Sequence, residues 1–564
     1  MYKRQTIYSF VAEAVTPNNL MVTQKQVYQG ASTLLETTQY CYNTNQSNCA
    51  TTAISSLPIT QMDTYKTLAG MSSSNRATVK YDSYGNMTEK DVYDFGASTP
   101  YQKTVASGFG YTWNGSTSSP NCTSLIGDGI MDKPCQVQLL TGTGTQLKNT
   151  YTQYSSTGHK IKTGILVNGS YVIATATYNA NGSVATVTDP NNQETTITEG
   201  ACNGGFPTVI SPPISSLAID ITWDSSCYGA QPVTITDPNS FSVSMTYADP
   251  FWRVTSVEDQ AGVYTNTTYI SPTQKETVLN FNSGKSIIDV VSTVFLSSTS
   301  SETQSLEGPS SGNWDTNVSD FVWDSTGIKN ESYLPCVASS KGGSCTGAKS
   351  TVTHAALGRP LVKTDGGSGV ITYSYIMGSS VYDVLAVLSP APAGESVKQV
   401  QKEYNGLGQL LSSCKISSAT GSTSCGQTNG GSGFVTTFTY NTDGTLQKSV
   451  KGSQTHSATY DNTGRVLTSV TPEGGTKQLF YDSAPSTPGV ACSTLSLPTN
   501  YTPIGHLLKT YDANGTTTCF SYDQMGRNTG IAYSGTNWDG VNKYFIYDAA
   551  TVNSVACLLY TSPS

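Results

Sequence analysis

The side chains best suited to catalysis are thinly spread along this chain of 564 residues. The four histidines, His159, His354, His456 and His506, stand in unrelated local contexts. The sequence contains no Gly-x-Ser-x-Gly nucleophile elbow, no His-Glu-x-x-His metal motif and no phosphate-binding glycine loop. We therefore predict ordinary strand or turn histidines, with no catalytic residue, no metal site and no cofactor.

Aspartate and asparagine gather in short segments whose oxygens could bind calcium. The nearest approaches are Asp189-Pro190-Asn191-Asn192 and Asp512-Ala513-Asn514-Gly515. Neither has the spacing or the terminal glutamate of a calcium loop. Because Asp and Asn side chains also accept hydrogen bonds from the backbone two residues on, they are common in turns. The sequence predicts turns at both places.

Cysteine is the other reactive side chain, with 13 copies. Zinc is disfavoured because no Cys-x2–4-Cys spacing occurs and histidine is scarce. If Cys557 is set aside with the terminal segment 557–564, the remaining twelve fall into couples close in sequence, although sequence alone does not fix connectivity. Reduced thiols are the alternative to disulfides, and disulfides imply an oxidising compartment. The disulfide candidates are Cys41–Cys49, Cys122–Cys135, Cys202–Cys227, Cys336–Cys345, Cys414–Cys425 and Cys492–Cys519.

The elements that must position these side chains follow from a repeat. Tyr440, Tyr460 and Tyr481 lie 20 and 21 residues apart, and the first two each begin a Tyr-Asx-x-x-Gly segment. A fixed period of this length is typical of a repeat architecture. Residues 434–440 alternate in the two-residue period of a β-strand and are β-favouring types. The sequence of each unit predicts a strand, a tight turn with glycine at positive φ, a bulge and a second strand.

The segment Tyr460-Asp461-x-x-Gly464-Arg465-Val466, followed by Thr471-Pro472-Glu473-Gly474-Gly475 and Tyr481-Asp482, resembles the YD repeat of the Rhs family. That family includes polymorphic bacterial toxins, components of insecticidal toxin complexes and wall-associated surface proteins. Looser copies extend over most of the chain. The residues that match the motif, which the resemblance implies are structural, are Tyr81, Asp82, Gly85, Tyr178, Gly182, Gly358, Arg359, Tyr404, Gly408, Tyr440, Gly444, Tyr460, Asp461, Gly464, Arg465, Tyr481, Asp482, Tyr511, Asp512, Gly515, Tyr522, Asp523, Gly526 and Arg527.

The resemblance implies an all-β fold, in which a YD-repeat array of β-hairpins forms a spiralling sheet that is part of a hollow β-shell, or cocoon. A single hairpin cannot bury its aromatic face, so neighbours must stack and cover one another's edges. Toxin-bearing members of the family also carry an Asp-Pro-x-Gly-Leu core that releases the toxin. The Asp-Pro pairs at Asp189, Asp237 and Asp249 continue differently, so we assign them no catalytic role.

Aromatic side chains could bind carbohydrate, because exposed Tyr and Trp rings can stack on sugars. The chain has 34 tyrosines, and those fixed in the repeat are expected to pack against neighbouring strands. Phe251 and Trp252 lie in Asp249-Pro-Phe-Trp-Arg253, where an aromatic element replaces Gly-Arg. They form the aromatic pair that we predict as a binding candidate.

The sequence predicts one continuous repeat array, flanked by two terminal segments that are not expected to be native protein. Residues 1–5 and 557–564 match the translation of a sequencing adapter and of its reverse complement, so we expect adapter scars on a fragment. Between them, the sequence predicts the start of a diverged β-repeat region over 6–75, diverged YD/Rhs repeats with Cys-containing insertions over 76–350, and clear YD/Rhs repeats over 351–556.

Composition narrows the classes of function. Charged residues make up 12% of the chain and the net charge is −8, which gives no basic surface for nucleic acid. No apolar run approaches the roughly 20 residues that a membrane-spanning helix needs. With the predicted disulfides, this indicates an exported protein, secreted or at the bacterial cell surface.

Two functions from different classes fit these expectations. The resemblance implies a non-enzymatic structural shell segment that encapsulates and helps to deliver a C-terminal toxin absent from this sequence. Its partners would be the rest of its own chain, including such a toxin domain. The alternative is a cell-surface or wall-associated adhesion protein that binds carbohydrate, with cell-surface glycans as partners.

Overall fold

The chain folds almost entirely into β-strands joined by short turns. A computed structural model describes residues 4–12, 19–43, 49–52, 54, 56–281, 286–294, 299–307, 315–323, 328–334, 336–338, 347–492, 497–499, 501–534, 542–548, 550–552, 555–557 and 560–563. Within these residues, the only helices are the single 3-10 turns η1 (Ile126–Asp128) and η2 (Ser215–Leu217). The predicted all-β fold is confirmed.

The strands in the first part of the chain run from the N-terminal end to the middle of the predicted diverged repeats. They are β1 (Arg4–Ala12), β2 (Leu20–Gln29), β3 (Thr33–Tyr42), β4 (Gln61–Leu68), β5 (Asn75–Tyr81), β6 (Met87–Tyr93), β7 (Gln102–Phe109), β8 (Tyr111–Trp113), β9 (Cys122–Ser124), β10 (Pro134–Thr141), β11 (Gln146–Tyr154), β12 (Lys160–Val167), β13 (Ser170–Tyr178), β14 (Val184–Thr188), β15 (Glu194–Ala201), β16 (Phe206–Ser211), β17 (Ile219–Trp223), β18 (Pro232–Thr236), β19 (Ser242–Thr246), β20 (Ser256–Glu258), β21 (Tyr264–Ser271) and β22 (Gln274–Phe281).

The remaining strands continue the same pattern to the C-terminal end. They are β23 (Ser286–Val294), β24 (Thr299–Glu307), β25 (Asp315–Trp323), β26 (Lys329–Tyr333), β27 (Cys336–Ala338), β28 (Lys349–His354), β29 (Pro360–Thr364), β30 (Val370–Met377), β31 (Tyr382–Ser389), β32 (Lys398–Tyr404), β33 (Leu410–Ile416), β34 (Thr423–Ser424), β35 (Ser432–Tyr440), β36 (Leu446–Lys451), β37 (Gln454–Tyr460), β38 (Val466–Thr471), β39 (Gly475–Tyr481), β40 (Leu507–Tyr511), β41 (Thr517–Tyr522), β42 (Asn528–Tyr533), β43 (Lys543–Ile546), β44 (Ala550–Val552), β45 (Val555–Cys557) and β46 (Tyr560–Pro563).

One antiparallel sheet holds 42 of the described strands. Most strands pair with their sequence neighbours, and insertions such as β8 with β9 are bypassed by pairs such as β7 with β10. In β35–β36, Tyr440 lies opposite Leu446, with a register shift between Thr439 and Tyr440. Because an extra residue on one strand shifts the register in this way, the predicted bulged hairpin is present.

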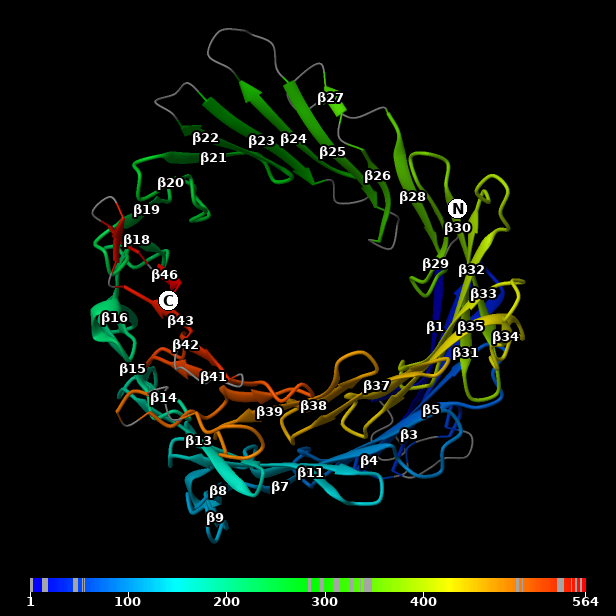
Figure 1. Cartoon of the computed structure of the whole chain (residues 1–564), viewed down its shortest axis with the longest axis horizontal. Coiled ribbons are helices and arrows are strands. Elements are labelled where there is room, and N and C mark those ends of the chain that lie inside the picture. Colours follow the sequence, from blue (N-terminus) through cyan, green and yellow to red (C-terminus); the bar gives the residue numbers. More distant parts are fainter. Residues whose placement is uncertain are drawn as a thin grey trace.

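The sheet curves into a ring that the chain travels round more than once (Figure 1). The blue strands near the N-terminus lie beside the yellow strands around β30–β35. Hydrogen bonds join the two circuits at sequence separations from 306 to 340 residues. The sheet is therefore a spiral, and each circuit takes a little more than 300 residues.

Turns in an antiparallel meander alternate between the two edges of the sheet, and we name these edges by their turns. Edge 1 carries the turns at residues 82–86, 155–159, 179–183, 249–253, 355–359, 405–409, 441–445, 461–465 and 523–527, and edge 2 carries those at 189–193, 237–241, 259–263, 365–369 and 512–516.

Full burial is found mainly where insertions cover the sheet. The β8–β9 hairpin and β34 lie on the outer side of the ring (Figure 1). Trp113 of β8 is completely buried. Its indole packs so closely on β12 that a Cβ added at Gly164 would come within 2.7 Å of the ring. The described part of the chain has no helix with the length and apolarity needed to cross a membrane.

Candidate functional site

Most Asx-x-x-Gly turns are closed by the side chain of their first residue, whereas in the turns at Asn179 and Asn441 a residue inside the turn takes this part. In the turn at 461–465, Oδ1 of Asp461 accepts hydrogen bonds from the backbone N–H groups of Thr463 (2.9 Å) and Arg465 (3.0 Å). Gly464 has φ of +88°, in the left-handed region that favours glycine. The same pair of backbone hydrogen bonds closes the turns that begin at Asp82 and Asp523. The aspartate is thus a fixed part of the turn.

The tyrosine before many of the edge-1 turns has a second role that sequence reasoning missed. The hydroxyl of Tyr460 donates to the carbonyl of Leu446 at 2.7 Å. Leu446 begins the strand after the previous edge-1 turn. The same hydroxyl-to-backbone bond is made by Tyr42, Tyr154, Tyr178, Tyr247, Tyr269, Tyr375, Tyr440 and Tyr522.

The arginine after the glycine joins one unit to the next. Arg465 donates from Nε to Oδ2 of its own Asp461 at 2.6 Å. It also donates from its two terminal nitrogens to the oxygens of Asp482, at 2.8 and 2.7 Å, and stacks over the Tyr481 ring at 4.7 Å. Arg527 likewise pairs with Asp523 and Asp548 and lies over the ring of Tyr547.

The electrostatics of this contact favour the charged forms. Burial raises the pKa of Asp461, but hydrogen bonds from Thr463 and Arg465 outweigh burial and bring the pKa below its ordinary value. Burial also raises the pKa of Asp482, and its hydrogen bonds from Arg465 and the Gly505 backbone again lower it overall. A hydrogen bond to Asp482 is the main reason that the pKa of Arg465 is raised. The Tyr-Asp-x-x-Gly-Arg segment is therefore both a turn and a lateral link.

Two histidines occupy the place of this arginine. His159 ends the turn at 155–159 and stacks on Tyr178, with ring centroids 4.6 Å apart. His506 packs against Tyr522 with the rings tilted by 37° and their centroids 4.5 Å apart, and burial lowers the pKa of His506. His354 stands in the place of the tyrosine, opposite Pro360 across a register shift. His456 lies within β37 opposite Ser449.

Two of the predicted motif copies differ from the others. Tyr511-Asp512 precedes a turn on edge 2, and Tyr511 pairs with Thr517 in a ladder without a register shift. After Tyr481-Asp482, the chain makes a long excursion to His506 in place of a tight turn. Asp482 nevertheless caps this excursion, because its Oδ1 accepts a hydrogen bond from the Gly505 backbone at 2.6 Å.

Phe251 and Trp252, the predicted binding pair, lie in an edge-1 turn but do not act together. Trp252 takes the positive φ (+56°) that glycine has in other turns. Its ring covers Gly229, where an added Cβ would lie 2.2 Å from a ring carbon. Phe251 is 79% exposed, and Tyr228, which precedes Gly229 in the chain, is 87% exposed. Of the predicted pair, Phe251 is therefore the exposed ring, and Trp252 is packed on the chain.

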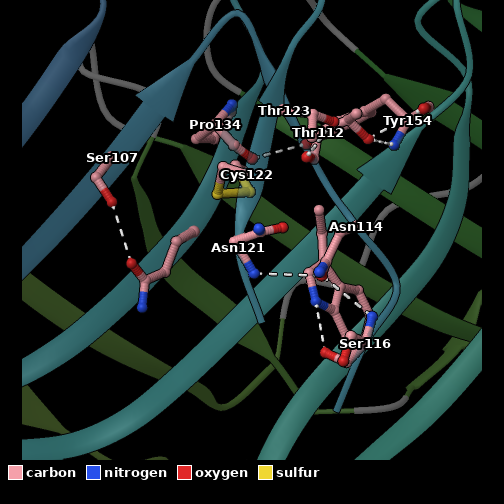
Figure 2. Close-up of a disulfide and its surroundings, with 12 residues drawn as sticks. Ser107, Thr112, Asn114, Ser116, Asn121, Cys122, Thr123, Pro134 and Tyr154 are labelled. Atoms are coloured by element: carbon pink, nitrogen blue, oxygen red, sulfur yellow. Dashed lines mark hydrogen bonds between the residues drawn. A yellow bond between two sulfur atoms is a disulfide. The ribbon is translucent and has the colours of Figure 1, made fainter. Parts of the chain in front are cut away.

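Five of the six predicted cysteine couples are disulfide-bonded in the structure. The sixth, Cys336–Cys345, lies in part outside the described residues. Figure 2 shows the Cys122–Cys135 disulfide beside the hydrogen bond of 2.6 Å from the Tyr154 backbone to the Thr112 hydroxyl. The disulfide and this bond fix the insertion that contains β8 and β9 to the sheet.

The insertion at 417–431, tied by Cys414–Cys425, covers strands β31 to β33 through polar contacts. The backbone of Asn429 donates to Oδ2 of Asp383 at 2.8 Å, and Gln427 donates to the Ser412 hydroxyl at 2.7 Å. Asp383 is fully buried, and this burial, with Glu403 beside it, raises its pKa to about 6.

Hydrogen bonds also join the two circuits of the sheet along a seam. Edge-1 turns of the second circuit lie against edge 2 of the first. Oδ1 of Asp94 accepts the backbone N–H of Gly406 at 2.6 Å, and Gln29 accepts that of Ala356 at 2.7 Å. Tyr101 donates to the carbonyl of Asn441 at 2.5 Å. Side chains of the first circuit thus bind the backbone of the second-circuit turns.

Comparisons with known proteins give a likeness in fold. No family model matches the chain, and no curated protein matches it in sequence. A crystal structure of TcdB2-TccC3-TEV is similar with a TM-score of 0.62 at 9% identity, over 93% of this chain and 35% of that chain. Crystal structures of TcdB2-TccC3, and of TcdB2-TccC3 without its hypervariable C-terminal region, give TM-scores of 0.54 and 0.53 at 11% and 9% identity, covering 94% and 96% of this chain.

This chain spans only 34% and 36% of those two structures. At such low identity, the likeness shows a shared fold, a large β-shell, and nothing about residues in common.

Proposed function

We propose that this chain is a wall segment of a non-enzymatic Rhs/YD-repeat shell, which encloses a toxin domain belonging to the full protein and helps to deliver it. The observation that carries the proposal is the seam. Bonds such as Asp94 to Gly406 (2.6 Å) and Tyr101 to Asn441 (2.5 Å) close the gap between circuits, as containment requires. The fold shared with TcdB2-TccC3 structures supports the same proposal.

The proposed location is outside the bacterial cytoplasm, secreted or on the cell surface. Support comes from the five disulfides, because such bonds persist in oxidising compartments. The partners in this proposal are the rest of the same chain and its toxin domain.

The test is protection of the enclosed domain in the complete protein. The coding sequence on both sides of this segment would be recovered and the whole protein produced with its disulfides. A protease should then spare the downstream domain in the wild-type protein and cut it faster in Asp94→Ala, which loses a seam bond. Equal cleavage of that domain in the folded wild-type protein and in the isolated domain would contradict containment.

Adhesion to carbohydrate is the second candidate, and the exposure of Phe251 (79%) and Tyr228 (87%) favours it. Exposed aromatic rings could stack on sugar rings. A glycan array probed with the wild-type chain and with Phe251→Ala tests this function. Binding that is lost in the variant would support adhesion, and absence of binding across a broad panel would count against it.

A further inference from the structure

Arg359 occupies the arginine position of an edge-1 turn but lacks the carboxylates that its counterparts hold. Arg465 pairs with Asp461 and Asp482, and Arg527 pairs with Asp523 and Asp548, with nitrogen–oxygen distances of 2.6 to 2.8 Å. In the turn at 355–359, Ala355 stands where those turns have aspartate.

The backbone of this turn is nevertheless the same. The N–H of Ala355 donates to the carbonyl of Arg359 at 2.7 Å, and the N–H of Gly358 donates to the carbonyl of Ala355 at 2.8 Å. Only the carboxylate is missing.

The Arg359 side chain is consequently a partly buried cation that no carboxylate of the described residues contacts by a hydrogen bond, although Glu36 acts on it from a distance. Its Nε is buried without a hydrogen-bond partner among the described residues. Its guanidinium lies 4.3 Å from the centre of the Tyr375 ring. Burial lowers the pKa of Arg359, and the smaller opposing effects of Tyr375, Tyr382 and Glu36 do not offset it. A guanidinium that has lost water without gaining an anion is destabilising, and an added anion would remove that penalty.

A cavity of about 410 Å³ at the seam gives access to this guanidinium. Lys66, Asn75 and Phe95 line it from the first circuit, and Arg359, Tyr382 and Asn405 line it from the second. The acidic residue in the lining, Glu36, is held by Lys66 at 3.0 Å. The remaining charge in the cavity is that of Arg359, and the volume suits a small organic ligand or one side chain of a polypeptide.

We propose that this seam cavity binds a carboxylate-bearing ligand, with the carboxylate paired to the Arg359 guanidinium. The geometry is given by the chain itself, because the two oxygens of Asp482 lie 2.8 and 2.7 Å from the terminal nitrogens of Arg465. Such paired hydrogen bonds are among the strongest in proteins and select carboxylates by shape. Since the walls come from both circuits, a bound ligand holds the two circuits together.

The first test titrates sodium glutamate into the disulfide-bonded chain and follows binding by calorimetry, with sodium chloride at equal ionic strength as the reference. Saturable binding of glutamate is expected, and Arg359→Gln should weaken it at least tenfold. Lys148→Gln is the matched control, because Lys148 lines a neighbouring seam cavity of about 360 Å³. It should leave binding unchanged. An equal response to chloride, or no binding of glutamate, would overturn the proposal.

A second variant keeps Arg359 and supplies the missing carboxylate. Ala355→Asp recreates the aspartate of the turn at 461–465, which pairs with the arginine Nε and leaves the terminal nitrogens free. The added carboxylate should neutralise the Arg359 guanidinium, so glutamate binding should weaken severalfold while the protein stays folded. Full glutamate binding by folded Ala355→Asp would overturn the proposal, even if Arg359→Gln failed to fold. Comparing free glutamate with a short glutamate-containing peptide distinguishes a small-molecule source of the carboxylate from a polypeptide one.

Discussion

The two edges of the sheet carry the same turn in different settings. On edge 2, Oδ1 of Asp512 accepts hydrogen bonds from the backbones of Asn514 (3.0 Å) and Thr516 (2.8 Å), as Asp461 does for its own turn on edge 1. On edge 1 the strand before Asp461 is also bulged. A tyrosine hydroxyl and an arginine there connect the turn to neighbouring units. The edge-2 turn at 512–516 has no register shift beside it and ends in Thr516, which carries no charge.

This difference shows which residues form a hairpin and which residues link hairpins into a wall. The Asx-x-x-Gly segment is sufficient for the hairpin, since both edges have it. Tyrosine before the segment and arginine after it are the additions that tie one hairpin to another. In the second circuit, these edge-1 turns also form the seam. In that circuit the extra contacts therefore lie at the seam, whereas the tyrosines of the first circuit make the same contacts away from it.

The largest expected effect comes from removing the shared aspartate on each edge. Asp461→Ala removes a buried carboxylate that accepts from Thr463 and from both the backbone and the side chain of Arg465. It leaves the guanidinium with one carboxylate partner in place of two, and we expect a loss of about 3 kcal/mol in local stability. Asp512→Ala loses only backbone hydrogen bonds, so its expected cost is about 1 kcal/mol.

Native-state hydrogen exchange measures this comparison, because a repeat array opens locally and not as one unit. Faster exchange should be confined to β37–β39 in Asp461→Ala and to β40–β41 in Asp512→Ala. Equal losses in the two variants would show that the arginine link adds nothing beyond the turn.

The local chemistry of the turns could be predicted from the sequence. Asp461, Gly464 and the bulge at Tyr460 follow from turn and strand propensities, because each depends on residues a few positions away. The hydroxyl of Tyr460 could not be assigned, since its partner is the backbone carbonyl of Leu446, which no residue type marks. The motif alone does not reveal that Tyr511 precedes an edge-2 turn, because the parity of the strands decides the edge.

The seam was beyond sequence reasoning for a different reason. Which residues meet across it depends on the curvature of the sheet summed over more than 300 residues, as the separation of 331 residues between Asn75 and Gly406 illustrates. Small changes in strand twist would shift every contact. Asp94 and Gln29 belong to no motif, so no local signal could have revealed them as seam residues.

We expect acidic pH to cause a loss of stability of intermediate size. Because the pKa values of Asp461 and Asp482 are lowered in the folded protein, the unfolded state binds more protons as pH falls. The stability that these carboxylates contribute is complete above the ordinary aspartate pKa of about 3.9 and is lost as pH falls through the lowered values. Protonation keeps the side chains in place, so the loss should be smaller than in Asp461→Ala.

The chain itself provides a neutral version of this link for comparison. In the turn at 405–409, Asn405 and Gln409 replace the aspartate and the arginine, and their side chains meet at 2.8 Å. The double variant Asp461→Asn/Arg465→Gln copies that pair. Hydrogen exchange in β37–β39, corrected for its intrinsic pH dependence, should accelerate below about pH 4 in the wild-type chain and much less in the double variant. The same acid response in both would mean that other groups cause it.

We expect the smallest loss of stability from removing one tyrosine hydroxyl on each edge. This pair of variants is also the most specific comparison of the two edges. Tyr522 donates to the carbonyl of Leu507 at 2.7 Å, whereas the Tyr511 hydroxyl has no hydrogen-bond partner among the described residues. Tyr522→Phe should therefore cost about 1 kcal/mol in the exchange of β40–β42, because a carbonyl loses its partner, and Tyr511→Phe should cost close to nothing. The two substitutions remove the same atom from adjacent strands, so ring packing is preserved in both. If Tyr511→Phe and Tyr522→Phe lowered stability equally, the stabilising effect of the tyrosine hydroxyl would come from its hydration. It would then not come from the hydrogen bond to the backbone carbonyl.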